Sequence, residues 1–215
     1  MMTGLLFDLD GTLLDTLEDL LDSTNYALDV HGFPPRTLPY LRSVVGNGAA
    51  NQIRKSLPEG TAEETVQQVL ATYKAYYTDH CQIKTGPYDG IGEMLTQLAG
   101  KYRLAIVSNK PDSAVKELCN VWFPGIYALG ESADCPRKPA PDMVHKAMKA
   151  IGAENCIYIG DSEVDILTAR NAGAVCLSVT WGFRDREQLE GAGAEHFCED
   201  PRQLPEKIEE MTHGK

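Results

Sequence analysis

The stretch GLLFDLDGTLLD, residues 4–15, decides the fold of this chain. It opens with an apolar run that ends at Phe7, and two aspartates, Asp8 and Asp10, follow at once. The apolar run predicts a buried strand, and side chains two residues apart on a strand point the same way. We therefore expect both carboxylates at the C-terminal end of one strand, with Gly11 allowing a sharp turn after them.

Two neighbouring carboxylates repel each other unless a cation or a shared proton offsets their charge. Oxygen ligands of this kind suit Mg²⁺. The pair Asp8 and Asp10 therefore predicts a magnesium site, and the alternative is a solvated turn that is merely acidic.

Downstream of residue 88, apolar runs that are typical of strands alternate with helical patterns; the runs cover residues 104–107, 126–129, 156–159 and 175–179. This alternation predicts an α/β core with a doubly wound parallel sheet. Residues 16–84 show helical spacing broken by proline and glycine, with no clear strand. We therefore predict a core domain from residues 1–15 and 85–215, and a helical insertion over 16–84.

Further polar residues follow the later strands of the predicted core. Ser108 and Asn109 come after one apolar run, and Asp161 comes after another. Ligands of doubly wound sheets bind at the C-terminal ends of the strands. We therefore expect these residues to form one site with Asp8, whereas Trp181-Gly182-Phe183 is better explained by core packing.

Four segments, taken in chain order, resemble the four motifs of the haloacid dehalogenase superfamily. They are Asp8-x-Asp10-Gly-Thr12, Ser108 after a strand, Lys138 in the run KPAP, and Asp161 with Asp165 four residues later. The resemblance covers nearly the whole chain and implies a Rossmann-like core. It further implies that Asp8 is a nucleophile that forms an aspartyl-phosphate and that Asp10 is the general acid and base.

The resemblance also implies roles for the other motif residues. The phosphate would be bound by Thr12, Ser108, Asn109 and Lys138. Mg²⁺ would be held by Asp8, Asp161 and the backbone carbonyl of Asp10, while Asp165 would orient Lys138 or bind the ion through water. A surface position for Lys138 and a purely helix-capping role for Asp161 are the alternatives.

The insertion resembles the small α-helical cap of phosphoglycolate phosphatases, particularly over residues 41–49. In such a cap Arg42 or Lys55 would bind a substrate carboxylate, although both also suit an ordinary helix surface. The favoured function is a Mg²⁺-dependent phosphatase that hydrolyses a small phosphorylated metabolite, with 2-phosphoglycolate preferred. A sugar phosphomutase and an inorganic pyrophosphatase are alternatives. A non-catalytic phosphate-binding module is disfavoured, because binding alone needs no nucleophile facing an acid.

Composition narrows the choice of partners and location. The 215 residues carry a net charge of −11, which disfavours nucleic acid and anionic membranes. No apolar stretch approaches the roughly 20 residues that span a bilayer, and six scattered cysteines form no CxxC pair. We therefore expect a cytoplasmic protein with free thiols, monomeric or homodimeric, whose partner is a small metabolite.

Overall fold

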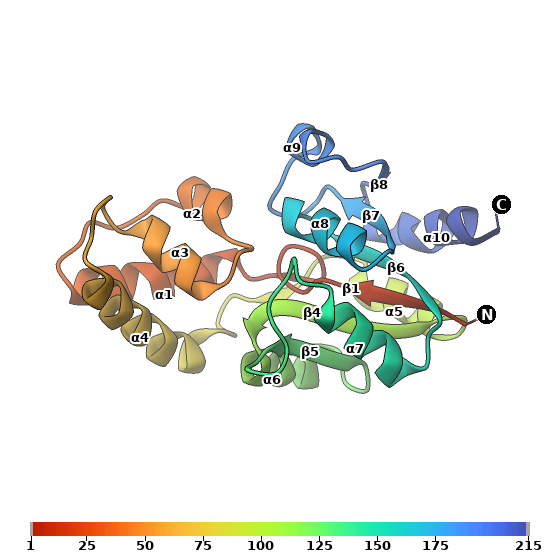
Figure 1. Ribbon diagram of the computed structural model, residues 1–215, viewed down its shortest axis with the longest axis horizontal. Helices are drawn as coiled ribbons and strands as arrows, with labels where there is room; N and C mark the ends of the chain where they lie inside the picture. Colours follow the sequence, from red (N-terminus) through yellow and green to blue (C-terminus); the bar gives the residue numbers. More distant parts are fainter. Residues whose placement is uncertain (1, 214–215) are drawn as a thin grey trace. The chain divides into compact units, whose positions relative to one another are not determined.

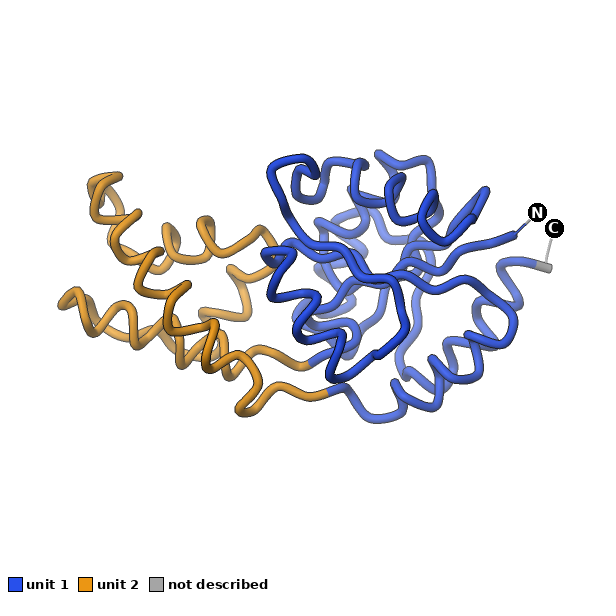
Figure 2. The backbone as a smooth tube through the Cα atoms, turned by 90° about the horizontal axis from the view of Figure 1, so that it is seen from below, with its two compact units in different colours: residues 1–14, 87–215 blue, residues 15–86 orange. Residues whose placement is uncertain are grey.

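The computed structural model describes residues 2–213. The chain forms two compact units, one of Met1–Leu14 with Pro87–Lys215 and the other of Asp15–Gly86 (Figure 2). We call them the core unit and the helical unit. In the structure the chain crosses between the units after Leu14 and before Pro87, whereas the sequence predicts the crossings after residue 15 and before residue 85.

The core unit is built on a six-stranded sheet in the order β5-β4-β1-β6-β7-β8, with every neighbouring pair parallel (Figure 1). Its strands are β1 (Thr3–Phe7), β4 (Arg103–Pro111), β5 (Tyr127–Glu131), β6 (Asn155–Gly160), β7 (Val175–Val179) and β8 (His196–Cys198). The predicted doubly wound α/β fold is thereby confirmed. The order reverses between β1 and β6, and sheets of this topology bind ligands at that point, beyond the strand ends.

The helices of the core unit are α5 (Ile91–Ala99), α6 (Asp112–Trp122), α7 (Asp142–Ile151), α8 (Glu163–Asn171), α9 (Arg186–Gly191) and α10 (Leu204–His213), with a 3₁₀ turn at Pro201–Gln203. One face of the sheet packs Leu6 and Tyr158 against Met143 of α7 and Ala169 of α8. This packing removes Tyr158 completely from solvent and fixes the start of α8 beside the end of β6.

The helical unit contains α1 (Leu17–Val30), α2 (Leu38–Val44), α3 (Ala49–Ser56) and α4 (Glu63–His80), and α1 packs along α4. A two-stranded sheet of β2 (Leu14–Asp15) and β3 (Gly86–Pro87) marks the two crossings of the chain. The Asp15 carboxylate accepts the Leu17 N–H at 3.2 Å, which satisfies a donor at the start of α1. None of the helices within residues 2–213 has the length and apolar character that crossing a membrane requires.

Candidate active site

Asp8 stands directly after β1, where its N–H donates to the carbonyl of Ile159 at 2.8 Å. Its carboxylate oxygen Oδ1 accepts the Leu9 N–H at 2.7 Å and lies 2.8 Å from the ammonium of Lys138. Within residues 2–213 we find no donor on the second oxygen, Oδ2. One oxygen of Asp8 is therefore anchored, while the other is available for chemistry.

The turn after Asp10 depends on glycine. Gly11 has a φ of +83°, and a Cβ added there would lie 2.3 Å from Oδ2 of Asp161. Only glycine satisfies both conditions. The first motif can therefore approach Asp161 closely although the two segments are distant in the sequence.

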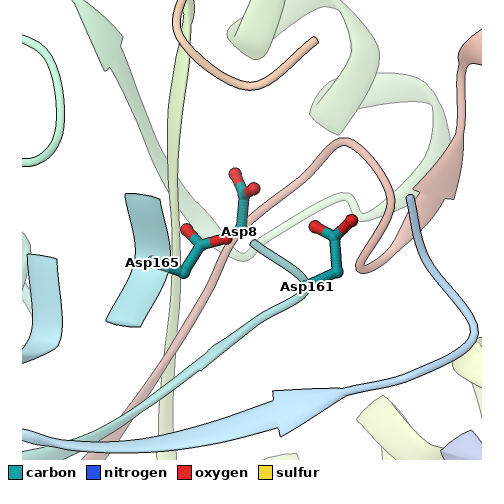
Figure 3. A group of neighbouring side chains, drawn as sticks. All are labelled: Asp8, Asp161 and Asp165. Carbon is teal, nitrogen blue, oxygen red and sulfur yellow. The ribbon is translucent and has the colours of Figure 1, made fainter. Parts of the chain in front are cut away.

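Three buried carboxylates meet at the switch point of the sheet, as Figure 3 shows. One oxygen from each of Asp8, Asp161 and Asp165 lies within 4.8 Å of the others. Asp8 follows β1, Asp161 follows β6, and Asp165 lies in the first turn of α8. The structure thus brings together three of the acids that the sequence assigns to one site.

The electrostatics of this cluster favour a bound cation. Burial raises the pKa of the Asp8 carboxyl well above its usual range, and the Asp165 carboxylate acts in the same direction while Lys138 opposes it. Burial, followed by the charge of Asp165, raises the pKa of Asp161 to about 7. The three buried carboxylates therefore carry more negative charge than the neighbouring positive groups balance. Such a set of oxygen ligands suits Mg²⁺.

Lys138 lies at the centre of the site and is only 2% exposed. Its ammonium donates to Asp165 at 2.8 Å and to the Tyr158 hydroxyl at 3.0 Å, in addition to the ion pair with Asp8. Burial alone would lower the pKa of this lysine, but Asp165 and Asp8 outweigh that effect and hold the pKa well above its usual range. Lys138 is therefore a fixed positive charge beside the candidate nucleophile.

The backbone of Lys138 is held by the side chain of Asn109. The amide oxygen of Asn109 accepts the Lys138 N–H at 2.7 Å, and its Nδ2 donates to the Lys138 carbonyl at 3.1 Å. The peptide bond between Lys138 and Pro139 is cis. Asn109 therefore connects the second motif to the third, and its contact with substrate stays a prediction.

Asp165 is engaged on both carboxylate oxygens. Oδ1 accepts from Lys138, while Oδ2 accepts the backbone N–H of Ser162 at 3.1 Å and the Ser162 hydroxyl at 2.6 Å. These contacts cap α8 and hold Lys138 at the same time. They favour an orienting role for Asp165 over direct binding of a metal.

Two predicted phosphate ligands, Thr12 and Ser108, lie buried at the same strand ends. The Thr12 hydroxyl donates to Oδ1 of Asp161 at 3.2 Å, and the Ser108 hydroxyl accepts the Lys110 N–H at 3.2 Å. Both side chains thus support neighbouring site residues. Their contact with phosphate stays a prediction.

The segment Trp181–Phe183, for which the sequence favours core packing, contacts the site after β7. The Phe183 N–H donates to Oδ2 of Asp161 at 2.7 Å, and Trp181 Nε1 donates to the Thr12 carbonyl at 3.0 Å. A Cβ on Gly182 would lie 2.2 Å from the carbonyl oxygen of Gly11. Its place after a strand of the same sheet is the signal that could have assigned this segment to the site.

Arg42 and Lys55 belong to the helical unit, on α2 and α3 respectively, and both are exposed. The Lys55 carbonyl accepts a hydrogen bond from the Tyr40 hydroxyl. Lys55 also lines an open hollow together with residues 57–61. The predicted contact of Arg42 or Lys55 with a substrate carboxylate stays a prediction.

A parallel α/β sheet with clustered aspartates and a buried lysine at its switch point is a site suited to phosphoryl chemistry. Residues 5–179 match the model of the haloacid dehalogenase-like hydrolase family, and the chain belongs to that family. This match confirms the family predicted from the sequence, and the phosphoglycolate phosphatases described next confirm the predicted phosphatase class.

Several known proteins are similar to this chain in sequence and in fold. A phosphoglycolate phosphatase of Xanthomonas campestris pv. campestris is 34% identical over an alignment of 216 positions, and the alignment covers 94% of each chain. Phosphoglycolate phosphatase 1 of Pseudomonas aeruginosa is 32% identical over an alignment of 189 positions, and the alignment covers 83% of this chain and 69% of that protein. A crystal structure from Lactobacillus delbrueckii subsp. bulgaricus, 38% identical, superposes with a TM-score of 0.92 and covers 96% of this chain and 98% of its own.

Proposed function

We propose that this protein is a Mg²⁺-dependent phosphatase that hydrolyses 2-phosphoglycolate through an aspartyl-phosphate on Asp8. The observation that carries the proposal is the anchoring of Asp8 by Lys138 and the Leu9 N–H, beside Asp161. The choice of 2-phosphoglycolate is supported by the names of the relatives from Xanthomonas and Pseudomonas.

Asp8, Asp161 and the backbone carbonyl of Asp10 would hold the ion. When bound, Mg²⁺ neutralises charge on the phosphoryl oxygens. Lys138 supplies a second positive charge from the protein side. Thr12 and Phe183 hold the carboxylate of Asp161 in place, so that the ligand set is oriented before substrate arrives.

The chemistry proceeds in two displacements. Asp8 Oδ2 forms a bond to phosphorus while the bond to the leaving oxygen breaks, and that oxygen takes a proton from Asp10. A water then attacks the aspartyl-phosphate, gives a proton to Asp10, and releases inorganic phosphate and Asp8. Ser108 and Lys138 stabilise the phosphoryl oxygens in both steps.

The test is a phosphate-release screen over small phosphate esters and pyrophosphate, with Mg²⁺ and with EDTA. We expect Mg²⁺-dependent release, with the highest kcat/KM on 2-phosphoglycolate, and a loss of roughly 10,000-fold or more in Asp8→Asn. The matched control is Asp79→Asn, an exposed position on α4, which should keep full activity.

Other outcomes of this screen would change the function that we assign to the protein. Isomer formation from a hexose 1-phosphate without phosphate release indicates a phosphomutase, and preference for pyrophosphate indicates a pyrophosphatase. Turnover that Asp8→Asn leaves intact contradicts the proposed mechanism. The proposal includes a cytoplasmic enzyme that is monomeric or homodimeric, and the six free cysteines support the cytoplasmic location.

A further inference from the structure

We propose that Lys110 is a positioning residue that holds the carboxyl group of Asp10 for proton transfer to the leaving oxygen. The inference rests on the proposed phosphatase function and adds a residue that the four motifs do not contain. Its basis is the ion pair between Lys110 Nζ and Asp10 Oδ1, 3.0 Å apart.

Lys110 is unusually well buried for a lysine, with 8% of its side chain exposed against 15% for Asp10. Lysine is almost never fully buried unless it is paired. Among residues 2–213, the buried basic residues are Lys110, Lys138 and Arg184, and each pairs with an acid at the same edge of the sheet. Lys110 thus pairs with Asp10 in the same way that Lys138 pairs with Asp8.

Stability is a poor explanation for this pair. Removing two charges from water costs several kcal/mol, and buried ion pairs often contribute no more stability than apolar groups of the same volume. A buried pair does fix the orientation of its members. The useful consequence here is the orientation of Asp10, the residue that the mechanism requires as acid and base.

The backbone of Lys110 is itself fixed. The pairing of β4 with β5 shifts register between Val107 and Pro111, and such irregularities redirect side chains next to active sites. The Lys110 N–H donates to the Ser108 hydroxyl. A Cβ on Gly130 would lie 2.6 Å from the Lys110 carbonyl oxygen, so β5 presses directly against this backbone.

The chemistry makes the role measurable. Lys110 holds Oδ1 of Asp10 and thereby fixes the orientation of the carboxyl group that gives its proton to the leaving oxygen. As the bond between phosphorus and that oxygen breaks, the electron pair of the bond takes up the proton of Asp10. An alkoxide leaving group needs this proton, whereas a nitrophenolate leaves without it. Loss of Lys110 should therefore slow alkyl esters selectively.

The experiment compares kcat/KM for wild type, Lys110→Gln and Lys110→Arg on 2-phosphoglycolate, ethyl phosphate and p-nitrophenyl phosphate with Mg²⁺. This ratio reports the steps up to departure of the leaving group. We expect Lys110→Gln to lose roughly 100-fold on both alkyl esters and less than about threefold on the aryl ester. Lys110→Arg, which keeps the charge, should recover most of the loss.

Asp10→Asn supplies the matched reference. It should show the same selectivity for alkyl esters, and adding Lys110→Gln to it should cause little further loss, because the two residues act as one unit. Additive losses in the double variant would overturn the proposal. Circular dichroism and melting temperature verify the fold of each variant.

Each remaining outcome is also decisive. An equal loss on all three esters means that Lys110 supports the fold or binds phosphate, and a loss confined to 2-phosphoglycolate means that it binds the substrate carboxylate. Undiminished activity in Lys110→Gln means that the pair has no catalytic role. A wild-type protein inactive on all three esters refutes the proposed function, and this inference with it.

Discussion

The ion pairs at the active site of the core unit differ in burial from the ion pairs of the helical unit. In the core unit, Lys138 is buried and pairs with Asp8 and Asp165. In the helical unit, the pair of Arg54 with Glu63 leaves the two side chains 52% and 58% exposed. Exposed pairs contribute at most about 1 kcal/mol to stability, whereas buried, perturbed charges are typical of functional sites.

Burial alone does not mark the active site, as Asp19 of the helical unit demonstrates. Asp19 is 2% exposed, and its carboxylate accepts the backbone N–H groups of Lys84 and Thr85. Backbone donors satisfy its charge, whereas Asp8 and Asp161 face further carboxylates. The distinguishing property of the active site is therefore charge that the protein leaves undercompensated.

The largest expected effect comes from removing the central cation of the core unit. Lys138→Met should reduce kcat by roughly 1,000-fold because the positive charge beside the phosphoryl group is lost. It should also destabilise the protein by about 3–5 kcal/mol, since two buried carboxylates lose their partner. Activity and urea unfolding measure the two effects.

Arg54→Met is the control for that experiment, because it breaks an exposed pair in the helical unit. It should change the free energy of unfolding by less than about 0.5 kcal/mol and leave kcat unchanged. If Lys138→Met and Arg54→Met changed kcat and the free energy of unfolding equally, the proposed difference between the buried and the exposed ion pairs would be wrong.

An intermediate effect is expected from the buried acid of the helical unit. Asp19→Ala leaves the N–H groups of Lys84 and Thr85 without their acceptor and should cost about 2–3 kcal/mol. Urea unfolding measures the loss, and the exposed Asp22→Ala serves as control. A smaller loss for Asp19→Ala than for Asp22→Ala would show that the backbone contacts of Asp19 contribute nothing.

The smallest expected effect has the opposite sign. Asp161→Asn removes one of three mutually repelling carboxylates, so we expect a melting temperature in EDTA that is roughly 2–4 °C higher, equivalent to about 1 kcal/mol. Mg²⁺ should stabilise wild type but not the variant, because a ligand is lost. A lower melting temperature in EDTA would contradict the undercompensated charge. The measurement is differential scanning calorimetry with and without Mg²⁺.

Much of the fold and part of the site can be predicted from the sequence because their signals are local. Apolar runs followed directly by Asp8, Ser108 or Asp161 predict strands with polar residues at one edge. The prolines after Lys138 restrict the backbone that carries this lysine to the site. The short elements after residue 180, among them β8, carry too little periodicity for such a prediction.

The supporting residues act through contacts that no local pattern encodes. Tyr158 is part of an apolar strand run, yet its hydroxyl contacts Lys138. Lys110 contacts Asp10 from the part of β4 where its pairing with β5 changes register. Gly182 matters because its backbone touches Gly11, a contact between segments far apart in the chain.

The most direct test of the account is the stereochemical course at phosphorus. A thiophosphate ester of glycolate is made chiral at phosphorus with two oxygen isotopes and hydrolysed by the Mg²⁺-loaded enzyme in water that carries the third. Two in-line displacements, first by Asp8 and then by water, predict net retention of configuration. Net inversion would show a single attack by water and would contradict the role assigned to Asp8.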